Sequence, residues 1–274
     1  MNVYKAVTQY FNEYRGKKCI IGKSAEGRNL YAMYIGKGGG AIGISQYALH
    51  AREWITAYLA IEHIKQSVCA GGVWVLPLMN PDGALLSQTG IESVGKDRRE
   101  FLLSINERED FSLWKANAEG VDLNLNFPAR WGKGRGNITD PAPHGYIGQE
   151  PLSAPESSSL ALFTEEVKPD YTVSWHTKGE EIYWRFHQPP MRARRDKRLA
   201  KIISKETGYP LKGTPFSAGG YKDWCVEALK IPAFTVEVGS DERTHPLGIE
   251  ALPDIVKKNI DVLVKLNVQY QKEL

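Results

Sequence analysis

The feature of this sequence that most restricts its fold is the alternation of short apolar segments with longer amphipathic ones. Buried strands are predicted at 41–45, 73–78, 171–175 and 233–238, and two more around a polar turn within 20–31. Helices are predicted at 1–15, 55–66, 155–167, 192–207, 221–229 and 253–272. Such alternation is typical of an α/β fold in which helices cover both faces of a mixed, largely parallel central sheet.

The length and composition of the chain favour one domain over residues 1–274. The 274 residues can bury one large core, and no internal repeat, low-complexity tract or linker divides them. A net charge of +3 is too small to indicate a nucleic acid or a membrane surface as partner. No apolar window is long enough to span a bilayer. We therefore expect neither nucleic acid nor membrane among its partners.

The cysteines and the first residues bear on the compartment. Cys19, Cys69 and Cys225 are an odd number, lie far apart and match no thiolate zinc pattern. Buried reduced thiols explain them, as expected in a reducing compartment. The first ten residues hold no apolar stretch of the kind found in signal peptides. These observations predict a cytoplasmic protein.

Three titratable residues follow or end the predicted strands. His50 comes shortly after the strand at 41–45, His176 ends the strand at 171–175, and Glu237 lies near the end of the strand at 233–238. The carboxyl ends of parallel strands meet at one edge of an open α/β sheet, where ligands bind. The sequence therefore predicts that these three side chains gather at one edge.

The same residues suggest a metal site. His50 and Glu53 are three residues apart, so one helical turn can direct both at one ion, although Glu53 could equally favour a helix dipole at an exposed helix start. A catalytic zinc needs three protein ligands and one open position, and two histidines with a glutamate are a known set. Of the remaining histidines, only His176 ends an apolar strand. We predict one Zn²⁺ per chain, held by His50, Glu53 and His176.

Five motifs, in order between about residues 20 and 240, resemble those of the zinc carboxypeptidase family. They are His50-Ala51-Arg52-Glu53-Trp54, Asn80-Pro81-Asp82-Gly83 (expected as a turn), Gly120-Val121-Asp122-Leu123-Asn124, Gly219-Gly220-Tyr221-Lys222-Asp223-Trp224 and Thr235-Val236-Glu237. The resemblance implies a carboxypeptidase-like fold and a metal-activated water that attacks a peptide bond.

The resemblance also implies roles for residues around the metal. Glu237 takes the proton of the attacking water and passes it to the leaving amine. Asp122 receives the second N–H of a ligand histidine. The family's oxyanion-stabilising arginine follows a tryptophan, and here Trp114 is followed by Lys115. Lys115 therefore supplies that charge, unless it is simply a solvated surface lysine.

One departure from the family concerns the grip on a terminal carboxylate. True carboxypeptidases use an Asn-Arg pair, whereas this sequence has Asn124 followed by Leu125, without the guanidinium. Asn124 remains a predicted substrate-binding residue. Arg130 or Arg135, from the following loop, could supply the missing charge, and Arg130 is the predicted choice. Ordinary trimming of C-terminal residues is placed in doubt.

A second departure concerns a phenol that the family places shortly before its Gly-Gly pair. Counting back from Glu237 without gaps puts Pro215 there, with Phe216 beside it, and neither can donate a hydrogen bond. Tyr221 or Tyr209 could take its place, and Tyr221 is the predicted substrate-binding residue.

A third departure points to the substrate. The segment 177–184, like Trp-Lys-Ala-Asn at 114–117, resembles the branch of the family that cleaves γ-D-glutamyl-diamino acid bonds in bacterial cell-wall peptides. Lys178 or a nearby arginine could pair with the free α-carboxylate of such a substrate. Glu180 or Glu181 could bind the extra ammonium of diaminopimelate, with Glu180 as the predicted residue, unless both belong to a solvated charged loop.

The sequence therefore predicts a zinc-dependent peptidase that hydrolyses the γ-D-glutamyl-diaminopimelate bond of muropeptides. Two alternatives remain from the residues alone. One is an ordinary metallocarboxypeptidase that removes C-terminal residues from peptides. The other is a muropeptide-binding protein without catalysis, which the presence of His50, Glu53, His176 and Glu237 disfavours.

Overall fold

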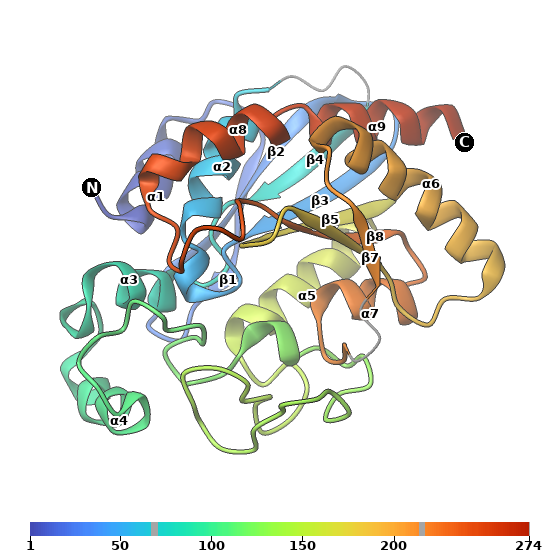
Figure 1. Cartoon of the computed structure of the whole chain (residues 1–274). Helices are drawn as coiled ribbons and strands as arrows, with labels where there is room; N and C mark the ends of the chain where they lie inside the picture. The colour runs from blue at the N-terminus through green and yellow to red at the C-terminus, as the bar shows by residue number, and fades with distance from the viewer. Residues whose placement is uncertain (67–70, 214–216, 274) are drawn as a thin grey trace.

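The computed structural model describes residues 1–66, 71–213 and 217–273, and its centre is an eight-stranded sheet (Figure 1). The strand order is β1-β2-β4-β3-β5-β8-β6-β7. The strands are β1 (Lys18–Lys23), β2 (Asn29–Gly38), β3 (Ile42–Tyr47), β4 (Gly71–Leu76), β5 (Tyr171–His176), β6 (Glu181–Arg185), β7 (Leu211–Gly213) and β8 (Ala233–Glu237). The inner strands β4, β3, β5 and β8 are parallel, and antiparallel pairing begins at β2 on one side and at β6 on the other.

Helices cover both faces of the sheet, as Figure 1 shows. One apolar core lies between the sheet and α1, α2, α6, α8 and α9, and the second between the sheet and α5 and α7. The helices are α1 (Val3–Glu13), α2 (Ile55–Ile64), α3 (Pro81–Thr89), α4 (Lys96–Asn106), α5 (Pro155–Val167), α6 (Pro190–Thr207), α7 (Tyr221–Glu227), α8 (Leu252–Asn259) and α9 (Val262–Glu273). The predicted mixed α/β fold is thereby confirmed.

The inner strands are buried on both faces. All six residues of β4 and of β5 are buried, because helices pack on either side of them. Successive side chains of a strand point to opposite faces. Val173 and Trp175 therefore pack in one core, while Thr172, Ser174 and His176 face the side of the sheet that carries α5 and α7.

Two sequence predictions were wrong in detail. The segment 80–83 is not a turn but the start of α3. The Asn80 side chain accepts a hydrogen bond from the Gly83 N–H, and Pro81 occupies the first helical turn, where its missing N–H costs nothing. The single helix predicted at 253–272 is divided into α8 and α9. Helix α4 and strands β6 and β7 were not predicted.

Some predictions fall outside the described part of the chain. Cys69, Pro215 and Phe216 belong to the segments 67–70 and 214–216 and are not described. Of the other two cysteines, Cys19 is half-buried and Cys225 is buried, both as free thiols. Within residues 1–66, 71–213 and 217–273, no helix combines the length and the apolar character that crossing a bilayer requires.

Candidate metal centre and active site

The loop after β3 positions His50 and Glu53. A short 3-10 helix spans Ala51–Glu53, and the Glu53 N–H donates to the His50 carbonyl over 3.1 Å. The Thr56 hydroxyl closes the turn, because it donates to the Glu53 carbonyl and accepts from the Ala48 N–H, each over 2.9 Å. The single helical turn predicted from their spacing therefore brings His50 and Glu53 to one side.

His50, Glu53 and His176 meet at the carboxyl ends of β3 and β5, as predicted. The Nδ1 atoms of the two histidines lie 3.1 Å apart. His50 Nδ1 is 2.9 Å from Glu53 Oε1, and His176 Nδ1 is 2.8 Å from Glu53 Oε2. All three side chains are buried, and their ligand atoms lie within 4.8 Å of one another.

These three residues fit a divalent metal ion. Two imidazole nitrogens and a carboxylate converge on one small space, where their lone pairs repel unless a cation lies between them. Burial opposes a charge on His50, but Glu53 raises the pKa of His50 above its ordinary value. Burial likewise disfavours the Glu53 carboxylate, yet His50 and His176 hold its pKa well below the usual range. Glu53 is therefore held as a carboxylate beside two imidazoles, a set of donors that suits a divalent cation.

Asp122 lies next to His50, on the side away from Glu53 and His176, and Lys115 contacts Asp122. Asp122 Oδ1 is 3.3 Å from His50 Nε2, the ring nitrogen that faces away from the cluster. Asp122 Oδ2 lies 2.9 Å from Lys115 Nζ and accepts from the Gly145 N–H over 3.2 Å. Although burial disfavours its charge, Lys115 and His50 lower the pKa of Asp122. Asp122 is therefore a carboxylate next to His50, and its role in orienting that ring stays a prediction.

Glu237 ends β8 directly beside His176. The two residues are Cα partners in the parallel pairing of β5 with β8, so their side chains share one face. Burial raises the pKa of Glu237 to about 8, while His176 and Lys115 oppose this rise and Glu53 and Glu181 add to it. A carboxyl whose pKa lies close to neutrality can both take and release a proton during a reaction.

The loop that carries Lys115 and Asp122 is held by buried amides that sequence reasoning did not select. The Asn117 side chain donates to Glu156 Oε2 over 2.9 Å and accepts from the N–H groups of Glu119 and Val121. Asn80 donates to the Ala116 carbonyl over 3.0 Å. Both asparagines lie within motifs found in the sequence, so their position there was the available signal.

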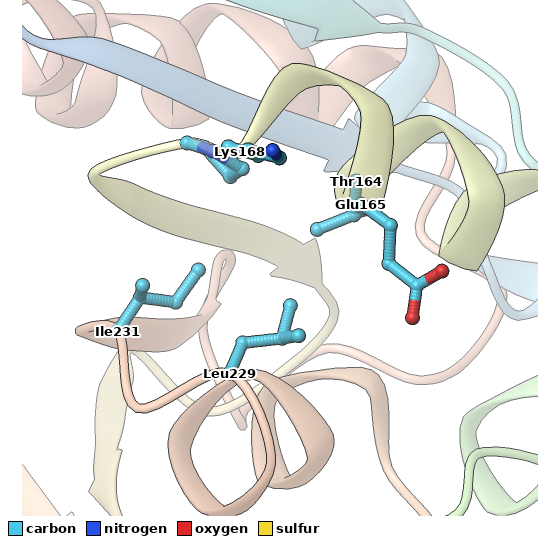
Figure 2. A pocket seen from close by; sticks show the side chains of 6 residues that line it. Thr164, Glu165, Lys168, Leu229 and Ile231 are labelled. Atoms are coloured by element: carbon cyan, nitrogen blue, oxygen red, sulfur yellow. The ribbon is translucent and has the colours of Figure 1, made fainter.

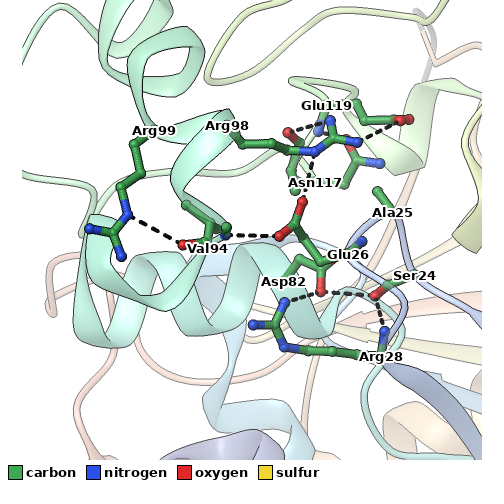
Figure 3. Close-up of polar contacts among 12 residues, drawn as sticks. Ser24, Ala25, Glu26, Arg28, Asp82, Val94, Arg98, Arg99, Asn117 and Glu119 are labelled. Atoms are coloured by element: carbon green, nitrogen blue, oxygen red, sulfur yellow. Dashed lines mark hydrogen bonds and ion pairs between the residues drawn. The ribbon is translucent and has the colours of Figure 1, made fainter.

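A second polar network, drawn in Figure 3, holds the start of α3 against the β1–β2 turn. Asp82 accepts from the Ser24 hydroxyl over 2.8 Å, from Arg28 over 2.6 Å and from the Glu26 N–H over 2.8 Å. Glu26 in turn pairs with Arg98 on α4 over 2.7 Å. The network therefore anchors the segment that contains Asn80, and through it the loop of Lys115.

The predicted substrate-binding residues after His176 have protein partners. Lys178 Nζ lies 3.0 Å from the exposed carboxylate of Asp241, and Lys178 itself is partly exposed. Glu180 pairs with Lys258 of α8 over 2.6 Å and faces a groove of about 350 Å³ between α8 and residues 239–243. Asn124 accepts from the Tyr221 N–H over 3.2 Å. A role in substrate binding stays a prediction for Lys178 and Asn124.

Two predicted substrate-binding residues are placed elsewhere. Tyr221 is fully buried in the core beneath α7, and its hydroxyl shares a hydrogen bond of 2.8 Å with Thr164. Tyr221 therefore has no surface for a substrate. Arg130 lies on the surface in an ion pair of 2.9 Å with Glu227 of α7. Tyr221 does not supply the missing phenol, so that assignment was wrong. A role for Arg130 in substrate binding stays a prediction.

A groove at the other edge of the sheet is separate from this site. It measures about 410 Å³ and lies at the amino ends of β5 and β8, where Figure 2 shows its lining. The lining residues are Thr164, Glu165, Lys168, Pro169, Leu229 and Ile231. His50, Glu53 and His176 lie at the carboxyl ends of β3 and β5, so this groove has no part in the candidate metal site.

Comparison with known proteins gives the same picture. The sequence pattern of the zinc carboxypeptidase family matches residues 8–260. The γ-D-glutamyl-L-diamino acid endopeptidase 1 of Lysinibacillus sphaericus is 29% identical over 265 residues, which is 89% of this chain and 65% of that protein. The chain thus spans less than two thirds of the length of this relative.

Solved structures share the fold. Bovine thrombin-activatable fibrinolysis inhibitor, in complex with a tick carboxypeptidase inhibitor, covers all of this chain with a TM-score of 0.77, 19% identity and 98% of its own chain. A murein-tripeptide amidase from Escherichia coli O157 covers 94% of both chains, with a TM-score of 0.64 and 20% identity. With the family pattern matched over residues 8–260, the chain belongs to the zinc carboxypeptidase family.

Proposed function

We propose that this protein is a zinc-dependent peptidase that hydrolyses the γ-D-glutamyl-diaminopimelate bond of peptidoglycan-derived peptides. The observation that carries the proposal is the convergence of His50, Glu53 and His176, with Glu237 on the adjacent strand. The family supports zinc as the ion, and the two imidazoles and one carboxylate suit it.

The residues around the cluster suit hydrolysis of a peptide bond. His50, Glu53 and His176 would hold the zinc ion, which would supply Lewis acidity toward the scissile carbonyl and a bound water. Glu237 accepts the proton of the attacking water and delivers it to the leaving amine, tasks that suit a carboxyl with a pKa near neutrality. Lys115, partly exposed and beside Asp122, supplies positive charge where the carbonyl oxygen becomes negative.

The absence of a carboxylate clamp supports the γ-D-glutamyl substrate. Leu125 stands where the family's arginine would bind a C-terminal carboxylate. Lys178 lies two residues after the ligand His176, and its partner Asp241 is an exposed group that binds weakly. Lys178 is therefore available to the free α-carboxylate that a γ-linked glutamate leaves beside the scissile bond. The relative from Lysinibacillus sphaericus is named as a γ-D-glutamyl-L-diamino acid endopeptidase, which supports the same class of substrate for this chain.

The proposal is tested with L-Ala-γ-D-Glu-meso-diaminopimelate and protein that is either zinc-loaded or stripped by a chelator. Mass spectrometry should detect diaminopimelate released by the zinc-loaded protein alone. Peptides with free and with amidated C-termini serve as controls for ordinary carboxypeptidase action. Release of C-terminal residues from the free peptides, without cleavage of the γ-D-glutamyl bond, would overturn the proposal in favour of a metallocarboxypeptidase.

A further inference from the structure

Strand β6 places a second carboxylate opposite Glu237. In the antiparallel pairing of β6 with β8, Glu181 is the Cα partner of Glu237, and Tyr183 is the partner of Thr235. Directly paired residues point to the same face, and neighbouring strands are about 4.8 Å apart. Glu181 therefore lies on the face of the sheet that also carries Glu237 and His176.

Protein partners leave the charge of Glu181 largely uncompensated. Its Oε1 accepts a hydrogen bond from the Tyr183 hydroxyl, which orients the carboxylate but adds no positive charge. Its Oε2 lies 3.8 Å from Lys212 Nζ, a long contact to a side chain that is half exposed. Two carboxylates opposite each other on adjacent strands destabilise a sheet unless a cation or proton compensates them. A cationic ligand group meets that need.

The same face also holds the hydroxyl of Ser174, which has no hydrogen-bond partner among the described residues. Ser174 is the Cα partner of Thr235 on the other side of β8, so Ser174, Thr235 and Tyr183 form a row beside His176, Glu237 and Glu181. The Ser174 side chain is 2% exposed. This face thus offers unused polar atoms next to the candidate active site.

Glu180 is unsuited to the same task. It has a left-handed backbone conformation, with φ of 53°, and its carboxylate pairs with Lys258 over 2.6 Å. That contact directs it to the groove along α8, whereas Glu181 faces Glu237. The sequence left the two glutamates as alternatives for reading an ammonium, and their pairing distinguishes them.

We propose that Glu181, oriented by Tyr183, binds the side-chain ammonium of the diamino acid on the leaving side of the scissile bond. This assignment rests on the proposed γ-D-glutamyl-diaminopimelate activity. Glu237 must approach the leaving amine to protonate it, and the diamino acid extends from that amine. Its second ammonium then meets a carboxylate on the next strand. Glu181 is thereby a specificity-determining residue and takes no part in bond cleavage.

The test compares two substrates that differ by one amine. L-Ala-γ-D-Glu-meso-diaminopimelate and L-Ala-γ-D-Glu-L-2-aminopimelate are offered to the zinc-loaded protein and to its Glu181→Gln and Glu180→Gln variants. For the unmodified protein, kcat/KM should favour diaminopimelate roughly 10- to 100-fold, the range of a charge-assisted hydrogen bond. Glu181→Gln should bring that ratio close to one, mainly through KM, while Glu180→Gln keeps it.

The ratio of kcat/KM for the two substrates separates recognition from catalysis. Any effect of Glu181→Gln on Glu237 changes kcat/KM for both substrates by the same factor and leaves the ratio unchanged. Zinc content and thermal unfolding confirm that the variants are intact, and Tyr183→Phe, which frees the carboxylate, should give an intermediate ratio. A preference that survives Glu181→Gln, or an unmodified protein without preference, would overturn the assignment alone. Cleavage of neither tripeptide, with ordinary peptides trimmed, would instead overturn the proposed function and this assignment with it.

Discussion

Asn117 donates from its side-chain amide to Glu156 Oε2 over 2.9 Å, and both residues are completely buried. This bond ties the loop that carries Lys115 and Asp122 to the first turn of α5. Because the Asn117 oxygen also accepts from Glu119 and Val121, one side chain holds the loop together.

Replacement of Asn117 by alanine should therefore affect both stability and turnover. The buried partners it leaves unpaired should lower the free energy of unfolding by about 2 to 4 kcal/mol. Displacement of Lys115 should lower kcat on the order of 10- to 100-fold. Denaturant unfolding and steady-state kinetics measure the two effects. Asn106→Ala, which removes a buried amide bonded to the Arg108 and Asp110 carbonyls, is the matched control and should leave kcat unchanged.

Glu156 should make stability depend on pH. Burial, with a smaller contribution from Asp82, raises the pKa of Glu156 to about 7. The folded state then holds a proton that the unfolded chain releases, so stability falls as pH rises from the unfolded pKa, about 4.5, to about 7. Between these pH values, the free energy of unfolding of Glu156→Gln should rise relative to that of the unmodified protein, by at most on the order of 3 kcal/mol. A difference in unfolding free energy that is constant with pH would contradict this.

Glu237→Gln should abolish turnover while leaving zinc binding intact. The amide keeps the size of the side chain but cannot accept the proton of water, and it lies beside the three proposed ligands without being one of them. Metal analysis and peptide assays on the same preparation test this. Retained activity in the variant would refute the role given to Glu237.

Lys115→Met should reduce kcat on the order of 100- to 1,000-fold, the cost of removing one group that stabilises an oxyanion. Lys115→Arg, which restores the charge, should recover part of the rate. Equal rates for the methionine and arginine variants would contradict a role for the charge of Lys115.

Asp122→Asn should weaken zinc binding roughly 10- to 100-fold, because the carboxylate that orients His50 loses its charge. Competition with a chromogenic chelator measures the dissociation constant. Asp110→Asn, at an exposed aspartate bonded to Ser112, is the matched control and should leave zinc affinity unchanged.

The sequence predicted the parts of the fold whose local pattern matches their environment. Strands β3, β5 and β8 are almost entirely buried, and they were found because each contains several large apolar residues that pack against the helices. Strand β6 (Glu181–Arg185) was missed because only Ile182 is aliphatic and buried, while its other residues are charged or aromatic and at most partly buried. Its place beside β8 depends on tertiary pairing, which no local pattern reports.

The candidate site was predictable where a residue type has few alternative uses. Histidines at strand ends located His50 and His176, and family motifs added Asp122 and Glu237. Substrate contacts were harder to predict, because the role of a charged surface residue depends on which residue it pairs with in the folded protein. Arg130 pairs with Glu227 and Glu180 with Lys258, and these partners lie far away in the chain.

The separation of the metal ligands along the chain has a consequence for biosynthesis. His50 and His176 are 126 residues apart, and only Glu53 is close to His50 in sequence. A nascent chain whose β5 has not yet emerged from the ribosome therefore contains His50 and Glu53 but lacks the third proposed ligand, His176. If these residues bind zinc as proposed, tight binding requires β3 and β5 to be paired side by side, so metal loading would follow the pairing of these two central strands.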